Sequence, residues 1–315
     1  MSLEVPFLEY GKVMRQRFGG RIQKLAIDAG LSCPNRDGKI GFNGCTFCLN
    51  EAFSPSYCRE CNSLYNQIDK AIDFHLARNR KAEYYIAYLQ SGSNTYADSD
   101  RLRKIYSDIL SHPEVSGLII GTRPDCISSE ILDILEDLSH STYIAIEYGI
   151  ESVYDTTLAR VNRGHNFQCA IDAVNESKAR GLDVGAHFIL GLPTESHDDI
   201  IAGISRINAL DLNFIKFHQL QIYRNTALER EYTAHPERFI FANNYTSNDY
   251  VNLLCNIIRH LKPSIAIERL SSLAPRHLLR HSPLQGIKPD ILRSRVIERM
   301  HSLNATQGDL IGTTF

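Results

Sequence analysis

The segment GLIIGTRPDCISSEILDILEDLSHSTYIAIEYG, residues 117–149, contains one complete strand–helix–strand unit. Its apolar runs at 117–122 and 142–149 are nearly continuous, which is typical of strands covered on both faces of a parallel sheet. Between them, residues 129–138 begin with a Ser-Ser capping signal and place apolar side chains along one broad stripe, as in an amphipathic helix. The segment therefore predicts a βαβ unit, in which a right-handed crossover joins parallel strands.

The same alternation recurs on both sides of this unit. Five further β-type runs lie at residues 23–29, 84–90, 183–191, 213–220 and 264–270. Further helical stretches lie at residues 102–110, 167–180, 198–210 and 249–261. A row of six or seven such units predicts an α/β fold, a full or partial (β/α) TIM-like barrel. In such barrels, functional side chains gather where the C-terminal ends of the strands meet the loops.

The pattern divides the chain into three parts. Residues 1–20 form an N-terminal extension, residues 21–270 the barrel core, and residues 271–315 a helical, mildly basic C-terminal extension. The basic residues near the C-terminus are Arg269, Arg276, Arg280, Lys288, Arg293, Arg295 and Arg299. They form either the solvated face of a helix that closes the barrel or a modest phosphate-binding patch for a nucleic acid.

Composition excludes several classes of protein. A net charge of −2 does not attract the chain strongly to nucleic acid or to a membrane surface. No apolar run approaches the roughly 20 residues that span a bilayer. The N-terminus lacks the apolar core and cleavage site of a secretory signal. We therefore expect a cytoplasmic protein without a membrane partner.

The cysteines are unevenly distributed. Five of the eight lie between residues 33 and 61, and the others, Cys126, Cys169 and Cys255, are typical of small buried side chains. Because a reducing cytosol disfavours disulfides, the dense group indicates a metal or redox site.

Three of these cysteines lie in LSCPNRDGKIGFNGCTFCLN, residues 31–50, directly after the first predicted strand. Proline, asparagine and glycine between Cys33 and Cys45 indicate an irregular loop that can wrap a compact object, and Cys48 follows in a CxxC. A structural zinc ion needs a fourth ligand, for which Cys58 or Cys61 is the candidate. A four-iron cluster on three cysteines leaves one iron open to an amine and a carboxylate. Thiolate ligands alone do not distinguish the two metals.

Six motifs occur in order: IDAGLSCPNRDG (27–38), GCTFCLNEAFSP (44–55), NTYA (94–97), GTRPDC (121–126), LARVNRGH (158–165) and HFILGLPTES (187–196). Over residues 20–280 the chain resembles the YhcC-like branch of the radical S-adenosylmethionine (SAM) superfamily, which is related to the catalytic subunit of Elongator. The resemblance implies a barrel of the radical SAM type. It also implies a [4Fe-4S] cluster on Cys33, Cys45 and Cys48, whose free iron binds SAM.

The resemblance implies an activity as well. The reduced cluster would cleave SAM to methionine and a 5′-deoxyadenosyl radical, which abstracts hydrogen from an unknown substrate. A reductant such as flavodoxin or ferredoxin would supply the electron. The relationship to Elongator allows RNA, in particular tRNA, as the substrate, although a small molecule is equally open.

The resemblance further implies cofactor-binding residues, which are Phe47, Gln90, Ser91, Gly92, Thr122, Glu151, Arg163, His187, Gly191, Leu192 and His218. Among them, Arg163 would pair with the carboxylate of SAM, because a guanidinium suits that geometry. The alternative for Arg163 is an ordinary salt bridge. Glu147 and Arg123 are candidates for catalysis beyond the cluster, and Glu147 must be paired or line a cavity because an isolated buried charge is costly.

Two functions from other classes stay open at this point. One is a zinc-stabilised module that binds nucleic acid. The other is an iron–sulfur protein for electron transfer without SAM, with Cys58 or Cys61 as the fourth ligand of the cluster. Apart from these roles, Cys58 and Cys61 could form an accessory metal site or a redox pair, or be inert.

Overall fold

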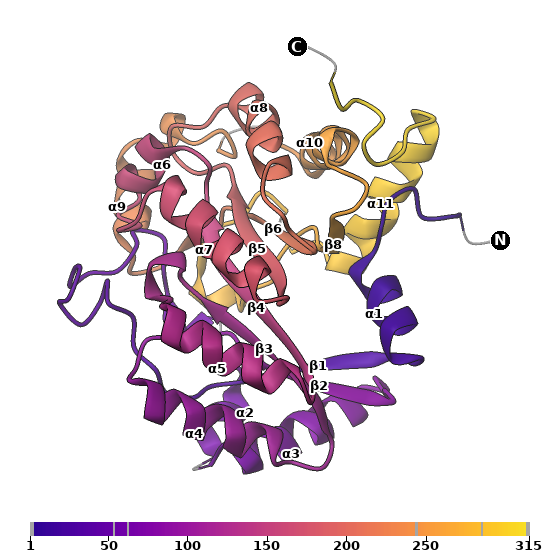
Figure 1. Ribbon diagram of the computed structural model, residues 1–315. Coiled ribbons are helices and arrows are strands. Elements are labelled where there is room, and N and C mark those ends of the chain that lie inside the picture. The colour runs from indigo at the N-terminus through magenta and orange to yellow at the C-terminus, as the bar shows by residue number, and fades with distance from the viewer. Residues whose placement is uncertain (1–2, 53, 62, 243–244, 285, 313–315) are drawn as a thin grey trace.

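The structure is a computed structural model that describes residues 3–52, 54–61, 63–242, 245–284 and 286–312. In these residues, seven parallel strands form one sheet in the order β1-β2-β3-β4-β5-β6-β8 (Figure 1). The strands are β1 (Ile22–Ile27), β2 (Tyr84–Leu89), β3 (Val115–Thr122), β4 (Tyr143–Glu151), β5 (Asp183–Leu190), β6 (Phe214–Gln219) and β8 (Ala266–Arg269). The seven predicted β-type runs are confirmed, and each matches a strand to within two residues at both ends.

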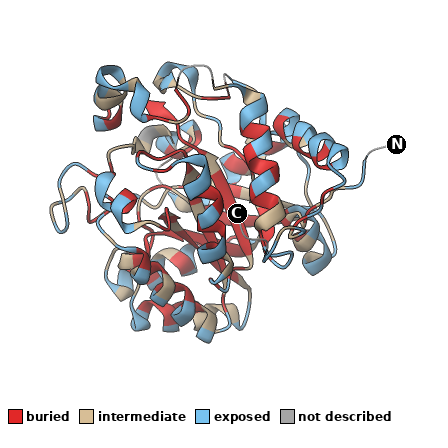
Figure 2. Cartoon of the chain, turned by 90° about the horizontal axis from the view of Figure 1, so that it is seen from above, coloured by how far each residue is buried: buried red, intermediate tan, exposed pale blue. Residues whose placement is uncertain are grey.

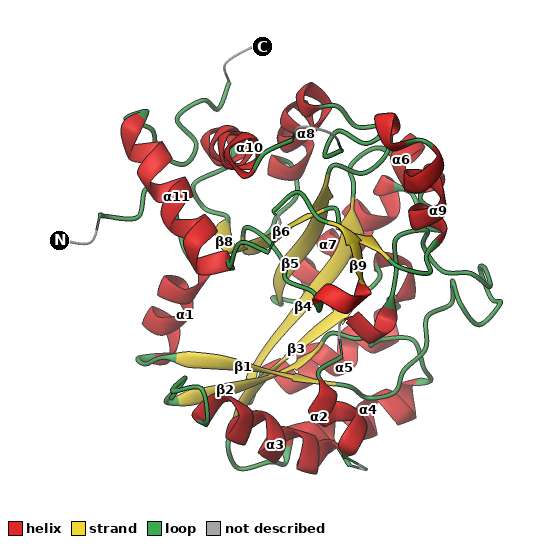
Figure 3. Ribbon diagram, turned by 180° about the vertical axis from the view of Figure 1, so that it is seen from behind, coloured by secondary structure: helices red, strands yellow, loops and turns green. Residues whose placement is uncertain are grey.

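The sheet curls into a half-barrel that stays open on one side. β1 and β8 are its edge strands, and no pairing joins them in the described residues. We call the open side between β1 and β8 the seam. Leu8 runs beside β8 and accepts a hydrogen bond from the backbone N–H of Ile267 at 2.8 Å. Helix α1 (Tyr10–Phe18) then contacts both edge strands, and Figure 3 shows it beside the seam. The expected (β/α) barrel is therefore of the partial kind.

Amphipathic helices cover the outside of the sheet. They are α3 (Leu64–Leu76), α4 (Ser99–Leu110), α5 (Ser129–Ser139), α7 (Phe167–Ala179), α8 (His197–Asn208) and α10 (Ser247–His260). All but α3 were predicted, to within three residues at each end. Figure 2 shows the buried residues on the strands and on the helix faces turned toward them. This burial of apolar side chains on both faces explains why the strands read as continuous apolar runs.

The other helices and strands complete the fold. They are α2 (Ser56–Glu60), α6 (Asp155–Arg160), α9 (Ala227–Ala234), α11 (Pro289–Ser302), and an antiparallel pair of β7 (Ile222–Tyr223) and β9 (Leu279–His281). Helix α11 packs on α10. The proposed boundaries of the barrel core stay predictions. None of the described helices has the length and apolar character needed to cross a membrane.

A buried carboxyl group connects the loops that follow β4 and β5. Glu195 is 7% exposed, and it accepts a hydrogen bond from the hydroxyl of Ser152. Burial raises the pKa of Glu195 to about 7, although the hydrogen bond from Ser152 acts in the opposite direction. The folded state therefore holds this proton at pH values where the unfolded chain releases it.

This proton makes the stability of the fold depend on pH. Between about pH 4.5 and pH 7 the folded state binds more protons than the unfolded state, so the free energy of unfolding falls as the pH rises. We expect Glu195→Gln, which has no proton to lose, to be more stable than the wild type at pH 8 by about 3 kcal/mol. The advantage should vanish near pH 4.5, as measured by urea denaturation at both pH values. A difference that is the same at both would contradict this interpretation.

Candidate active site

A cavity lies where the C-terminal ends of the strands meet their loops, the position expected for a barrel of this kind. It brings together most of the residues singled out in the sequence: Cys33, Cys45, Phe47, Cys48, Gln90, Ser91, Gly92, Thr122, Arg123, Glu147, Glu151, Arg163, His187 and His218. Apart from Arg163, which follows α6, they come from the strands β2 to β6 or the residues just after them and from the cysteine loop. The motifs and the resemblance that they carry were the sequence signal for most of these residues.

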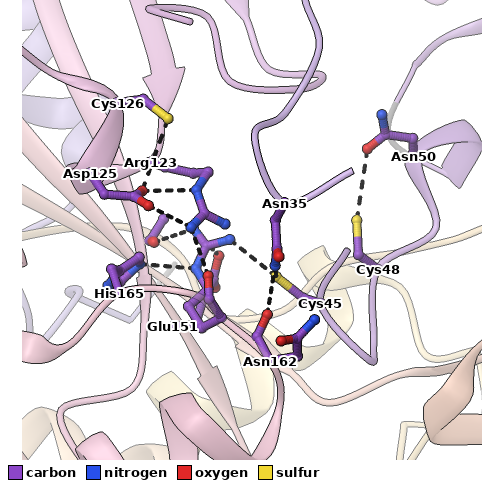
Figure 4. Close-up of polar contacts among 12 residues, drawn as sticks. Asn35, Cys45, Cys48, Asn50, Arg123, Asp125, Cys126, Glu151, Asn162 and His165 are labelled. Carbon is purple, nitrogen blue, oxygen red and sulfur yellow. Dashed lines mark hydrogen bonds and ion pairs between the residues drawn. The ribbon is translucent and has the colours of Figure 1, made fainter. Parts of the chain in front are cut away.

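The cysteine loop is fixed by the segment that follows α6. Asn35 donates to the backbone oxygen of Asn162 at 2.6 Å (Figure 4). Asn162 donates in return to the backbone oxygen of Gly44 at 2.8 Å. The backbone N–H of Thr46 also donates to the oxygen of Val161 at 2.9 Å. Two motifs that lie more than 100 residues apart in the sequence are therefore held side by side.

Hydrogen-bond donors point at two of the three sulfur atoms. Nη1 of Arg163 lies 3.4 Å and Nδ2 of Asn35 lies 3.7 Å from Sγ of Cys45. Nη2 of Arg36 lies 3.5 Å from Sγ of Cys48. Cations and N–H donors stabilise the thiolate, which is the form that ligates metal. The set fits an iron–sulfur cluster, whose potential depends on hydrogen bonds to its sulfur atoms.

Among the described residues, no group of three or more His, Cys, Asp or Glu side chains is arranged to hold a single metal ion. The choice between a cluster and zinc at the three cysteines therefore belongs to the proposal below.

Cys58 and Cys61 lie elsewhere. Sγ of Cys58 lies 3.6 Å from the backbone oxygen of Ala26 in β1, and Sγ of Cys61 lies 3.7 Å from that of Asn66 at the start of α3. Neither lines the cavity. Burial raises the pKa of the Cys58 thiol to about 12.

Two arginines meet at the wall of the cavity. Arg123 holds Asp125 through Nε and Nη2 at 2.8 and 2.7 Å, and Nη2 also donates to the backbone oxygen of Arg163 at 2.7 Å (Figure 4). Its remaining nitrogen, Nη1, is buried and has no partner in the described residues. Arg123 therefore keeps one buried donor for a group that enters the cavity.

The donors of Arg163 are already engaged. Besides the sulfur of Cys45, they contact the backbone oxygen of Gly149 and Nε2 of His165, and Nη2 lies 3.5 Å from Oε1 of Glu151. A carboxylate from SAM would have to displace or share these partners. Of the two arginines, Arg123 therefore keeps an unpaired donor among the described residues, whereas Arg163 is bonded through its nitrogens.

The backbone at the end of β4 is strained. Glu151 has φ 72°, in the left-handed region that few residues other than glycine adopt, and the pairing of β4 with β5 shifts register there. A side chain at Gly149 would come within 2.8 Å of both Glu151 and Arg163. Strain of this kind persists where the surroundings impose it and is common at functional sites.

A buried charge network forms the floor of the cavity. Glu147 is fully buried and accepts from Lys24 at 2.8 Å, Lys216 at 2.5 Å and His187 at 2.8 Å. Glu268 completes the network, at 2.6 Å from Lys24 and 3.2 Å from Lys216. Burial alone would raise the pKa of Glu147, but Lys216, Lys24 and His187 together hold it well below its usual value. Glu147 is therefore a paired carboxylate, one of the two arrangements expected for it.

The two histidines of β5 and β6 face each other, with ring centroids 5.4 Å apart. His187 is oriented by Glu147, whereas Nε2 of His218 is buried without a partner in the described residues. Burial, followed by the influence of His187, lowers the pKa of His218 well below its usual value, so this imidazole is neutral. A neutral imidazole can donate or accept a hydrogen bond toward the cavity.

Two of the expected cofactor-binding residues do not reach the cavity. Leu192 is 1% exposed and packs in the apolar core. A side chain at Gly191 would collide with the ring of Phe241, which lies over that backbone. The close approach to the backbone at Gly191 is therefore made by Phe241.

Several residues of the site were not singled out in the sequence. Besides Asn35 and Arg36, they are Gln219, Gln221, Tyr223 and Ser272, which line the cavity. Gln219 is tied to Ser272 by two hydrogen bonds of 2.7 and 3.0 Å, which join the loops after β6 and β8. These four cavity residues lie near the ends of β6, β7 and β8, and that position is the sequence signal that could have identified them.

Comparison with known proteins agrees with this geometry. Residues 38–206 match the Radical SAM superfamily, and residues 212–301 match the Radical_SAM C-terminal domain. The chain belongs to the radical SAM superfamily. It is 33% identical to protein YhcC of Escherichia coli K12 over 280 residues, which cover 89% of this chain and 87% of YhcC. It is 36% identical to MJ0486 of Methanocaldococcus jannaschii over 268 residues, which cover 84% of this chain and 80% of MJ0486.

The resemblance to Elongator is confirmed at greater distance. Elongator complex protein 3 of Homo sapiens is 23% identical over 227 residues, which cover 70% of this radical SAM chain and 39% of the human protein. The archaeal Elp3 of Methanocaldococcus infernus, with an N-terminal deletion, has a similar fold, with a TM-score of 0.66 and 15% identity. That match covers 91% of this chain and 64% of the archaeal chain, so this chain spans less than two thirds of the Elp3 proteins.

Proposed function

We propose that this chain is a radical SAM enzyme that holds a [4Fe-4S] cluster on Cys33, Cys45 and Cys48 and binds SAM beside it. The proposal rests mainly on the three cysteines, which line the cavity at the C-terminal ends of the strands. Hydrogen-bond donors are aimed at two of their sulfur atoms. Because Cys58 and Cys61 lie outside the cavity, the proposal leaves one corner of the cluster free for SAM. The same observation counts against the electron-transfer alternative, which needs a fourth cysteine.

The bound cluster would supply one electron to SAM, which breaks the S–C5′ bond and yields methionine and a 5′-deoxyadenosyl radical. The chain's own residues would bind and orient SAM and would exclude water from the cavity. Gln90, Ser91 and Gly92 follow β2 and would face the amino end of SAM. Glu151 would accept from ribose hydroxyls, and His187 and His218 would offer hydrogen bonds at the cavity floor.

The unpartnered nitrogen of Arg123 supports the proposal that this residue, rather than Arg163, binds the carboxylate of SAM. A hydrogen bond between charged groups contributes about 1.5–3 kcal/mol, so Arg123→Lys should weaken SAM binding about tenfold or more. Equilibrium dialysis of the anaerobically reconstituted protein measures this affinity, and iron content shows whether the cluster is retained. Arg101→Lys, on the exposed start of α4, is the matched control. Unchanged SAM affinity in Arg123→Lys would remove this role.

The substrate is proposed only as a class. Relatives named Elongator complex protein 3 make RNA, including tRNA, a reasonable substrate to test, and a reductant such as flavodoxin or ferredoxin would supply the electron. The expected cytoplasmic location stays a prediction. The basic residues near the C-terminus can still form either the solvated face of a helix or a phosphate-binding patch for a nucleic acid.

The experiment is anaerobic reconstitution with iron and sulfide, followed by SAM and dithionite. We expect a coloured protein with about four irons per chain and the formation of 5′-deoxyadenosine. A protein that carries an intact cluster but forms no 5′-deoxyadenosine would contradict the radical mechanism. A colourless protein with one zinc ion would support the alternative of a zinc module.

A further inference from the structure

A second cavity lies in the seam, outside the site described above. It has a volume of about 550 Å³ and is bounded by α1, β1, α3, β2 and β8. This volume is within the range of ligand-binding pockets. The half-barrel leaves its edge strands β1 and β8 unpaired to each other in the described residues, and the seam cavity runs along these two edges.

The walls of the seam cavity carry an excess of positive charge. Arg15, Arg21, Arg80 and Arg269 line it, and none of their guanidinium groups has a hydrogen bond or ion pair with any described residue. The carboxylate that lines the cavity, Glu268, is neutralised by Lys24 and Lys216. Glu83 lies nearby and accepts a hydrogen bond from the backbone N–H of Arg21, which leaves the Arg21 side chain free.

A buried histidine adds an unused polar atom to the same wall. His75, near the end of α3, is 8% exposed and lines the seam cavity, and its Nδ1 is buried without a partner in the described residues. Buried polar atoms are nearly always paired, so an unpaired one indicates a missing ligand or water. Burial and the nearby Arg80, Arg78 and Arg21 lower the pKa of His75, as expected for an imidazole surrounded by cations.

The seam cavity extends along the strand direction. Arg21 precedes β1, and Gln90 follows β2 beyond Leu89, which pairs with Ile27 at the other end of β1. Six residues of strand span about 20 Å, which exceeds the reach of one phosphate group. Gln90 lines both the seam cavity and the cysteine cavity, so the two adjoin at this residue.

We propose that the seam cavity binds a ligand with several phosphate groups, held by Arg15, Arg21, Arg80 and Arg269, with its reactive part directed past Gln90. Guanidinium groups suit phosphate because they donate two parallel hydrogen bonds. The ligand is either a nucleic-acid strand or a nucleoside polyphosphate, which share this chemistry. The inference deepens the proposed function by naming a feature of its substrate, but the site can bind phosphate whether or not SAM is cleaved.

The test measures the binding of three probes to the reconstituted protein by fluorescence anisotropy and competition. The probes are a 12-nucleotide RNA, ATP and AMP. For the bound polyphosphate probe, the double variant Arg15→Glu/Arg80→Glu should weaken binding at least 30-fold. The slope of log K against log salt should decrease in magnitude by about two, one for each lost phosphate contact. Arg15→Lys/Arg80→Lys should retain most of the affinity because it keeps both charges. Arg101→Glu, on the exposed start of α4, is the control for the effect of one charge reversal outside the seam cavity.

The set of probes that bind shows what kind of ligand the seam cavity takes. Binding of RNA alone identifies a strand, and binding of ATP as well identifies a polyphosphate site; both support the proposal. AMP that binds as tightly as ATP and RNA would overturn it, since one phosphate would suffice. Equal affinity in the wild type and in the glutamate variant would also overturn it. Iron content and SAM cleavage without substrate should be unchanged in both seam variants, so failure here is distinct from failure of the proposed function.

Discussion

Alanine at Cys33, Cys45 or Cys48 should each reduce bound iron from about four atoms per chain to near zero and lower 5′-deoxyadenosine formation about 10³-fold or more. The reason is that each proposed ligand holds a different iron, so loss of one sulfur removes a corner that no other cysteine can take. Cys58 and Cys61, the next in sequence, bond to backbone oxygens of Ala26 and Asn66 and do not line the cavity.

The matched control for these variants is Cys169→Ala. Cys169 lies in α7, outside the cavity, at a half-buried position where alanine is a good helix former. Iron content, visible absorbance and 5′-deoxyadenosine should all match the wild type. Substantial iron retained in any one of the three variants, together with SAM cleavage, would show that this cysteine is not a ligand.

Glu147→Gln should cost the fold about 3–5 kcal/mol, because it leaves a buried excess of positive charge. The wild-type network balances Glu147 and Glu268 against Lys24 and Lys216, and the variant keeps both lysines with one carboxylate. The midpoint of thermal unfolding should fall by about 6–10 °C. In the wild type, the depressed pKa of Glu147 means that its contribution is full above about pH 4.5 and is lost as the pH falls through the folded value.

A second substitution separates charge from packing. In Glu147→Gln/Lys216→Met, one cation leaves with the carboxylate, so the double variant should be more stable than Glu147→Gln alone, with a coupling of about 1–3 kcal/mol. Asp108→Asn, which breaks the exposed pair with Lys104, should change stability by less than about 0.5 kcal/mol. Additive effects of the two buried substitutions would show that the network does not act through its charge balance.

The strands were readable from the sequence because burial on both faces makes them continuous apolar runs, as in β4 and β5. Helix α3 was missed since its stretch, 64–76, begins among polar residues and follows the cysteine-rich segment that drew another interpretation. Helix α1 was missed because its mean composition is polar and only Tyr10 and Met14 are buried.

For the site, the motifs and the resemblance that they carry pointed to most of the residues that line the cavity. Their partners were not predictable, since those contacts join distant segments. The sulfur of Cys45 meets Arg163, and Glu147 meets Lys24 and Lys216, only after the sheet has curled. The same limit applies to Leu192, since its local sequence does not reveal that its side chain packs in the core.

The central claim is that three cysteines hold a cluster with one open iron that SAM occupies. Electron paramagnetic resonance of the dithionite-reduced protein, recorded with and without SAM, tests it most directly. We expect a spectrum of a reduced [4Fe-4S] cluster whose g values change when SAM is added, because SAM coordinates the open iron. A cluster spectrum that SAM leaves unchanged at saturating concentration would contradict the account.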